Sequence, residues 1–224
     1  MMVSPDFFDL EPLDLAQRLI GKVLRHRIHH PLHGDIWLSA RIIETEAYYL
    51  SERGSHSSLG YTEKRRAMFM DPGTIYMYYA RGGDSLNFSA QGEGNGVLIK
   101  SGSVHIDKKS PRSNVAVMQA MNPINGRARE ESRLCSGQTL LCRSLGLKVP
   151  DWNQRTLKRG KLVLEDVGIV PSQLIQSKRL GIPSGRDDHL PYRFIDFDFA
   201  HLATKNPLKD DHKIIHKTPR PLKD

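Results

Sequence analysis

The sequence contains little cysteine and no long hydrophobic run, and these two features limit the class of protein that it can encode. Only Cys135 and Cys142 occur among 224 residues, seven positions apart and without a neighbouring group of histidines. This spacing is not that of a zinc knuckle, and so few cysteines favour a reducing compartment. No apolar run approaches the roughly 18 residues of a membrane span, and residues 1–6 lack the features of a signal peptide. We therefore expect an intracellular, cytoplasmic protein without a membrane partner.

Motifs for nucleotide cofactors are absent as well. The sequence has no P-loop, no G-x-G-x-x-G and no G-x-S-x-G, and residues 92–96 lack the third-glycine spacing of a dinucleotide fingerprint. His29, His30 and His33 are three histidines within five residues, which raises the possibility of a metal site. Their turn-rich surroundings offer no carboxylate-rich partner, so a solvated loop is favoured. We predict neither a cofactor nor a bound metal.

The charge is strongly positive. The chain has 33 Lys and Arg against 25 Asp and Glu, which gives a formal net charge of +8, and the estimated pI is about 9.5. A basic surface of this size favours a polyanionic partner, and nucleic acid is the first candidate. The length suits one large domain or at most two small ones, and it is sufficient to bury a core.

Hydrophobic periodicity predicts strands linked by hairpins, with helices around them. The expected helices are residues 6–20, a short one from Thr62 to Met70, Ser113 to Met121, and one that follows Ser136–Gln138 and runs to Gly146. The expected strands are residues 22–28, 36–49, 74–79, 85–89, 97–100 and 162–167. We therefore predict an α+β fold with a central antiparallel sheet.

The same pattern suggests how the domain is bounded. Residues 1–204 form the single predicted domain, and residues 205–224 are predicted to be a loose, charged C-terminal tail. Residues 101–113, rich in Lys, Ser and Pro, are predicted to be an exposed connection.

Two carboxylates stand out in the long apolar stretch of residues 36–49. In an extended strand Glu44 and Glu46 share one face, roughly 7 Å apart. Burying a carboxylate without a partner is costly. Either the strand therefore frays into solvent at this point, or the carboxylates have hydrogen-bonding partners or a functional role. Glutamate beside an aromatic residue such as Tyr48 suits general-base chemistry. The spacing also matches an inverting glycosidase, but every i, i+2 strand pair shares it.

Aromatic residues lie among the basic ones in the first hundred positions. Tyr48, Tyr76, Tyr78 and Tyr79 are examples, and rings stack on bases while Lys and Arg bind phosphates. Tyrosines are also ordinary sheet residues, an interpretation that suits Tyr76 better than Tyr78.

Several motifs together resemble the alkyladenine (3-methyladenine) DNA glycosylase family. The likeness extends from Phe7 to about Phe199, with the same order of motifs along the chain. The motifs are Phe7-Phe8 with Leu15–Leu24, then Arg41–Tyr48, His56-Ser57, Met68–Tyr78, Leu86–Gly94, Val97–Ile99, Leu134–Cys142 and Arg179–Ile182. The resemblance implies a monomeric, metal-free enzyme that flips a damaged purine out of double-stranded DNA and hydrolyses its N-glycosidic bond.

The resemblance also implies roles for individual residues. Glu46 matches the general base that activates a water to attack C1′ of the sugar, whereas Glu44 matches no catalytic position. Tyr48, His56 and Tyr78 match residues that enclose the flipped base. Asn87 matches the residue that disfavours normal guanine by crowding its 2-amino group.

The chain departs from the family pattern at three places. Lys100 stands near the catalytic water where the family has an arginine, so it keeps the charge but loses the planar fork. The hairpin tip that carries the family's wedge tyrosine is one residue shorter, which leaves Arg81 or Tyr79 to fill the gap left by the base. We favour Arg81, and we expect Ile182 to contact DNA. Residues 108–112 form an extra basic connection, for which a solvated loop is favoured over a phosphate contact.

We therefore predict a monofunctional DNA glycosylase for alkylated purines, associated with the nucleoid if the source is bacterial. A lyase nucleophile cannot be picked out among 33 Lys and Arg by sequence alone. No helix–hairpin–helix block with a catalytic aspartate is found. The alternative is a non-catalytic nucleic-acid-binding module that retains the fold, and a Glu46→Gln variant separates the two.

Overall fold

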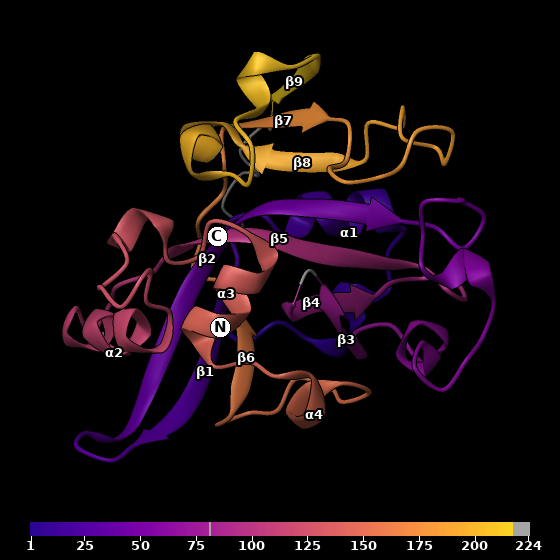
Figure 1. Ribbon diagram of the computed structural model, residues 1–224. Helices are drawn as coiled ribbons and strands as arrows, with labels where there is room; N and C mark the ends of the chain where they lie inside the picture. The colour runs from indigo at the N-terminus through magenta and orange to yellow at the C-terminus, as the bar shows by residue number, and fades with distance from the viewer. Residues whose placement is uncertain (81, 217–224) are drawn as a thin grey trace, which may run out of the picture.

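A large antiparallel sheet organises the fold in the computed structural model, which describes residues 1–80 and 82–216 (Figure 1). The strands of the described chain are β1 (Val23–His30), β2 (Gly34–Tyr48), β3 (Ile75–Ala80), β4 (Gly83–Ser89), β5 (Gly96–Val104), β6 (Leu162–Glu165), β7 (Gln173–Ser177), β8 (Arg193–Asp196) and β9 (His212–His216). Their order is β3-β4-β5-β2-β8-β7-β9, and β1 lies between the first half of β2 and β6. The predicted α+β class with an antiparallel sheet is confirmed.

Short helices surround this sheet. The α-helices are α1 (Pro12–Leu19), α2 (Ser113–Met121), α3 (Gln138–Leu145) and α4 (Val149–Trp152). The 3-10 helices are Pro5–Phe8, Ser57–Leu59, Arg66–Phe69, Glu131–Arg133, Phe197–Leu202 and Pro207–Lys209. The predicted helix at residues 6–20 is thus divided, because Pro12 has no backbone N–H to continue a helix and instead occupies the first turn of α1. None of the helices in the described chain is long and apolar enough to cross a membrane.

Along β2, β3, β4 and β5, successive side chains point alternately to an apolar face and to a polar face of the sheet. Phe88 of β4 pairs with Ile75 of β3 and Val97 of β5, and all three side chains are fully buried in the main core. The neighbouring positions, such as Asn87 and Leu98, therefore point to the opposite face. Burial of each large apolar side chain contributes about 1.5–3 kcal/mol, so the apolar face holds the sheet in place.

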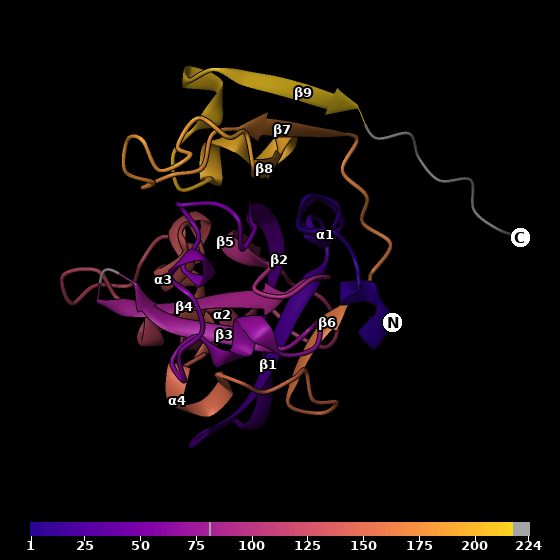
Figure 2. The same ribbon diagram turned by 90° about the vertical axis from the view of Figure 1, so that its right-hand side faces the viewer.

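The C-terminal residues differ from the predicted loose tail. β9 pairs with β7 over five residue positions, and together with β8 these strands lie at one end of the molecule (Figure 2). The alternation in His212–His216 is too short, and too rich in charge and histidine, to have predicted a strand. Residues 217–224, the remainder of the predicted tail, lie outside the described residues.

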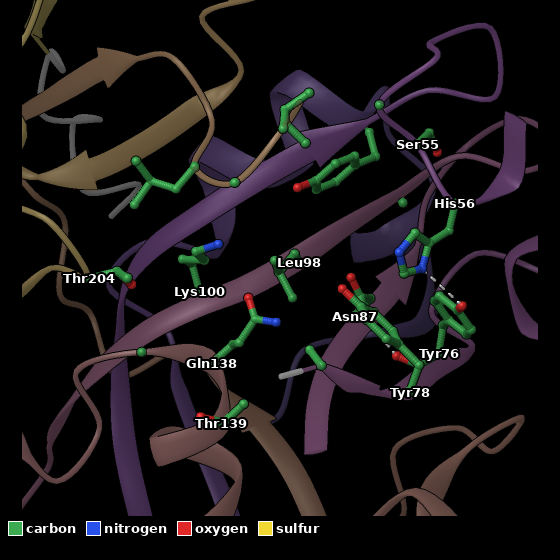
Figure 3. A pocket seen from close by; sticks show the side chains of 18 of the residues that line it. Ser55, His56, Tyr76, Tyr78, Asn87, Leu98, Lys100, Gln138, Thr139 and Thr204 are labelled. Atoms are coloured by element: carbon green, nitrogen blue, oxygen red, sulfur yellow. Dashed lines mark hydrogen bonds between the residues drawn. The ribbon is translucent and has the colours of Figure 1, made fainter. Parts of the chain in front are cut away.

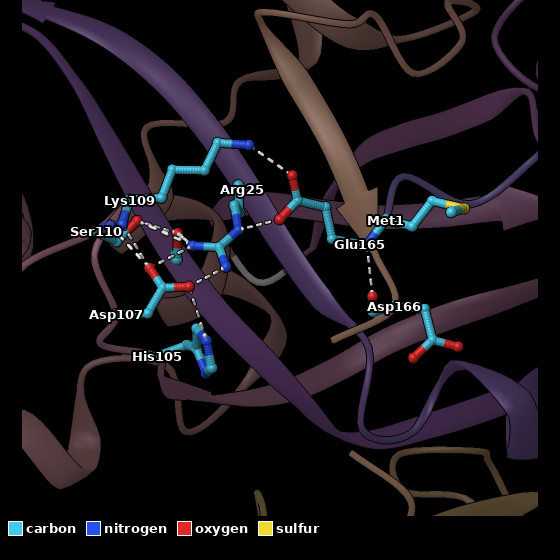
Figure 4. A network of polar contacts seen from close by, with 9 residues as sticks. Met1, Arg25, His105, Asp107, Lys109, Ser110, Glu165 and Asp166 are labelled. Carbon is cyan, nitrogen blue, oxygen red and sulfur yellow. Dashed lines mark hydrogen bonds and ion pairs between the residues drawn. The ribbon is translucent and has the colours of Figure 1, made fainter. Parts of the chain in front are cut away.

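The connection predicted at residues 101–113 is also corrected. β5 continues to Val104, and the segment that follows is fixed by Arg25, whose side chain is 1% exposed (Figure 4). The Arg25 guanidinium donates to both carboxylate oxygens of Asp107, at 3.1 and 2.5 Å, and to Glu165 at 2.7 Å. Lys109 also pairs with Glu165, and its ammonium lies 4.4 Å from the centre of the Trp37 ring. A buried cation requires such partners, so part of this basic segment is structural.

Candidate active site

The polar face of the sheet forms the floor of the candidate site. Register pairs Glu46 with Leu98, Leu98 with Asn87, and Asn87 with Tyr76, so these residues form a row across β2, β5, β4 and β3. Tyr48 and Tyr78 lie two positions further along their strands and therefore point to the same face. A β-bulge interrupts the β2–β5 pairing between Ile42 and Thr45, and bulges of this kind are common beside active sites.

A cavity of about 710 Å³ lies above this floor. Its walls come from the sheet, from residues 54–59, from the first turn of α3 with residues 136–137, from residues 180–183 and 186, and from Thr204. In Figure 3, Lys100 lies on one side of the site and His56, Tyr76 and Tyr78 on the other, with Leu98 between them. Cavities of this volume accommodate small organic groups the size of a nucleoside.

Glu46 lies fully buried directly beneath the cavity. Three donors point at its carboxylate: the Tyr48 hydroxyl at 2.8 Å, the Lys100 ammonium at 3.3 Å and the Leu180 amide at 2.9 Å. Glu46 itself is not part of the cavity wall, because Tyr48 and Lys100 lie on the cavity side of it. Three donors and no other acid among these contacts hold the carboxylate in a fixed orientation.

Lys100 provides a positive charge on the cavity side of Glu46. Its side chain is 10% exposed, and it is the one lysine among the cavity-lining residues of the described chain. β5 places it on the same face as Leu98, which brings its ammonium to Glu46 of the adjacent strand β2.

Tyr48 is held from behind by Arg179. The Arg179 guanidinium carbon lies 4.5 Å from the centre of the Tyr48 ring, and the same group forms an ion pair with Glu52 and donates to the Ala47 carbonyl. Burial, reinforced by the negative charge of Glu46, raises the pKa of Tyr48 well above its usual value. Tyr48 therefore keeps its hydroxyl proton and donates a hydrogen bond to Glu46.

His56, Tyr76 and Tyr78 form an aromatic wall at the other side of the cavity. The rings of Tyr76 and Tyr78 stack with centres 5.4 Å apart, and His56 meets Tyr78 edge-on at 4.4 Å. Desolvation by these rings, reinforced by the positive charges of Arg65 and Arg186, lowers the pKa of His56, so the imidazole is neutral at pH 7. Burial raises the pKa of Tyr76 to about 12.

Asn87 is held in place on the floor of the cavity by Tyr76. Its side-chain amide donates to the Tyr76 carbonyl at 3.0 Å, and the residue is 6% exposed. A side chain held in this way cannot move aside easily when a ligand approaches.

Glu44 has a different environment from Glu46. The Arg193 guanidinium donates to one of its oxygens at 2.7 Å. Ser101 and both the amide and the hydroxyl of Thr204 donate to the other. Both oxygens of the carboxylate thus accept hydrogen bonds, the residue is fully buried, and the strand does not fray into solvent. Glu44 instead fixes Thr204, which forms part of the cavity wall.

The predicted DNA-contacting residues lie at the rim. Tyr79 is 65% exposed and Ile182 is half-buried, and both line the cavity. Arg81 lies outside the described residues. The remaining predicted residues, Glu46, Lys100, Tyr48, His56, Tyr78 and Asn87, are brought together at this one cavity.

Sequence reasoning missed two side chains of the site. Arg179 was part of a recognised motif, but nothing in the sequence connects it with Tyr48, 131 positions earlier. Gln138 begins α3 and lines the cavity. A glutamine at a helix start has no sequence signal of its own. A search of the described residues finds no group of three or more His, Cys, Asp or Glu arranged to hold a metal ion.

Comparisons with known proteins agree with this arrangement. The protein-family model described as methylpurine-DNA glycosylase (MPG) matches residues 6–198. A protein of Pseudomonas aeruginosa strain LESB58, with the provisional name 3-methyladenine DNA glycosylase, is 57% identical over 224 residues, which cover 96% of this chain and 92% of the relative. A Pseudomonas fluorescens protein with the same provisional name is 58% identical over 91% of this chain and 86% of its own length. The mouse protein named DNA-3-methyladenine glycosylase is 33% identical over 86% of this chain and 58% of its own length.

Proposed function

Because the chain belongs to the methylpurine-DNA glycosylase family and is a DNA N-glycosylase, we propose that it releases alkylated purines of the 3-methyladenine type from double-stranded DNA. The reaction hydrolyses the N-glycosidic bond and leaves an abasic site. The observation that carries the proposal is the buried Glu46 carboxylate, with its three donors, directly beneath an aromatic cavity.

The damaged base enters the cavity by leaving the DNA stack. Flipping a base costs a few kcal/mol, least for a base whose pairing is already weakened. Stacking against Tyr48 on one side and Tyr78 on the other offsets this cost. Many alkylated purines carry a positive charge, and aromatic faces attract cations. His56 is neutral at pH 7, so it offers a polar contact without repelling such a base.

Glu46 then acts as the general base. A water held between Tyr48 and Lys100 attacks C1′ of the sugar and transfers its proton to the Glu46 carboxylate, while the purine leaves. Lys100 and the Leu180 amide keep the carboxylate oriented during this step. A positively charged purine is a better leaving group, because it departs as a neutral molecule.

Asn87 contributes selectivity. Its side chain is hydrogen-bonded in place on the cavity floor, where we propose that it crowds the 2-amino group of a normal guanine. At the rim, Tyr79 and Ile182 are proposed to contact the DNA around the flipped nucleotide, with Arg81 as the residue that fills the gap. We propose that the protein acts as a monomer. We place this activity in the cytoplasm.

The decisive experiment compares Glu46→Gln with Glu93→Gln on duplex oligonucleotides that carry different modified purines. Glu93 is exposed and lines no part of the cavity, so its variant is the matched control. Removal of a general base should slow base release about 10²- to 10⁴-fold, and the control should match the parent protein. Binding of the Glu46→Gln variant to an abasic duplex should survive.

Two results would contradict this assignment. Normal base release by the Glu46→Gln variant would exclude Glu46 as the general base. A parent protein that binds duplex DNA but releases none of the modified purines would instead be a non-catalytic binding module.

A further inference from the structure

We propose that Lys100 gives this protein a second activity, cleavage of the DNA strand at the abasic site through a Schiff base between the Lys100 amine and C1′ of the sugar. This activity rests on the proposed function, because the abasic sugar is the product of base release. It would make the protein a combined glycosylase and lyase.

The position of Lys100 is the first observation that supports this activity. Among the described residues it is the one buried lysine, and also the one lysine that lines the cavity. It lies on the cavity side of Glu46, where the attacking water and C1′ must meet during base release. After the base departs, C1′ remains next to this amine as part of the abasic sugar.

The second observation is a proton acceptor within reach of the amine. Only a neutral amine is a nucleophile, and the Glu46 carboxylate lies 3.3 Å from the Lys100 nitrogen. The two groups can therefore exchange a proton directly. A lysine amine forms imines with carbonyl groups, whereas an arginine guanidinium does not lose its proton in proteins and cannot do so. A lysine at this position thus allows chemistry that an arginine would not.

The steps balance with the two residues, the departing phosphate and one water. Lys100 gives a proton to Glu46, and its nitrogen attacks the C1′ aldehyde of the ring-opened sugar to form a carbinolamine. Glu46 returns the proton to the hydroxyl group, which leaves as water, and the C1′–N bond becomes an iminium. The regenerated carboxylate removes a proton from C2′, and the C3′–O bond breaks with loss of the 3′ phosphate. Glu46 passes the C2′ proton to the departing phosphate, and addition of one water to the iminium releases Lys100 and an unsaturated aldehyde on the cleaved strand.

The test uses a duplex in which the abasic site is already present, so that base release is not required. Sodium borohydride reduces an iminium to a stable amine and joins the protein covalently to DNA. The parent protein should give this adduct, together with strand cleavage when borohydride is omitted. Lys100→Arg should lose both. Lys178→Arg, at an exposed lysine close to Arg179, is the matched control and should keep both.

Three results would overturn the proposal. The first is the absence of any adduct with the parent protein, and the second is an adduct that persists in Lys100→Arg. The third is an adduct whose peptide, identified by mass spectrometry, does not contain Lys100. Base release from a modified purine is scored separately by alkaline cleavage of the abasic product. A protein that releases purines but forms no adduct therefore loses only the lyase activity, and the proposed function stands.

Discussion

Glu44 and Glu46 lie two positions apart on one face of β2, and their partners set them different tasks. Glu44 accepts hydrogen bonds from Arg193, Ser101 and Thr204 and faces no part of the cavity. Glu46 instead accepts hydrogen bonds from Tyr48 and Lys100, both of which line the cavity. The two glutamates thus differ: Glu44 holds the structure together, and Glu46 is the general base of the proposed mechanism.

This division predicts different losses when each charge is removed. Glu44→Gln leaves the Arg193 guanidinium, 1% exposed, without its counter-ion, which should lower the free energy of unfolding by about 3–5 kcal/mol. Urea unfolding of the variant measures this loss. Glu46→Gln serves as the comparison, because its partner Lys100 reaches the cavity and can be solvated there. Equal loss of stability in the two variants would contradict the separation of roles.

Individual site residues differ in how far the sequence predicts them. Tyr48, His56, Tyr78 and Asn87 occur in motifs near Glu46, and strand alternation alone puts Tyr48 on the face of Glu46. Arg179 could not be predicted as a partner of Tyr48, because the contact depends on how the chain returns after β7. The partners of Glu44 are missed for the same reason: Arg193 lies 149 positions away.

Elements are predicted well where their periodicity is long and poorly where it is short. β2 spans fifteen residues and forms a hairpin with β1 directly before it, so the sheet class is evident from the sequence. β7 and β9 have five residues each, too few for a clear pattern. The segment after β5 is charged and was predicted to be solvated, but Arg25 lies buried beneath it. Nothing within the segment itself indicates that a cation from β1 requires Asp107.

The Arg25 network predicts how stability depends on pH. Burial alone would raise the pKa of Asp107, but hydrogen bonds from Arg25 and the Ser110 amide lower it to about 2, below its usual 3.8. A lowered folded-state pKa stabilises the fold above the unfolded value, and this contribution is lost as pH falls from about 4 to about 2. The side chain is one-third exposed, so after allowance for solvent screening the contribution is about 1–2 kcal/mol.

The measurement is urea unfolding of Asp107→Asn and of the parent protein between neutral pH and about pH 2. The variant should be less stable near neutral pH, and the difference should shrink as pH falls through the window above. Asp211→Asn, at an exposed position, is the control and should follow the parent throughout. A difference that stays constant down to the lowest pH would show that Asp107 contributes through its shape and not through its charge.

In the molecule as a whole, the net positive charge is proposed to serve DNA binding and the cavity is proposed to serve base release. The formal net charge of +8 attracts the phosphate backbone of any DNA. In the proposed mechanism, base release takes place in a cavity that contacts a single flipped nucleotide of the DNA. Composition predicted the polyanionic partner but could not place the cations, because their positions on the surface follow from the fold.

Salt should therefore act on binding and leave the chemical step unchanged. If binding neutralises about five phosphates, the association constant should fall about 500-fold between about 50 and 200 mM salt, because each contact releases condensed counterions. The measurement is the dissociation constant of a fluorescent undamaged duplex at several salt concentrations.

Single-turnover base release is measured on a modified duplex with enzyme in saturating excess, so that every duplex is bound at each salt concentration. Its rate should be constant, because Glu46 and Lys100 are buried and screened little by salt. Binding that does not change with salt would contradict recognition through phosphates, and a salt-dependent rate at saturation would show that backbone contacts also take part in the chemical step.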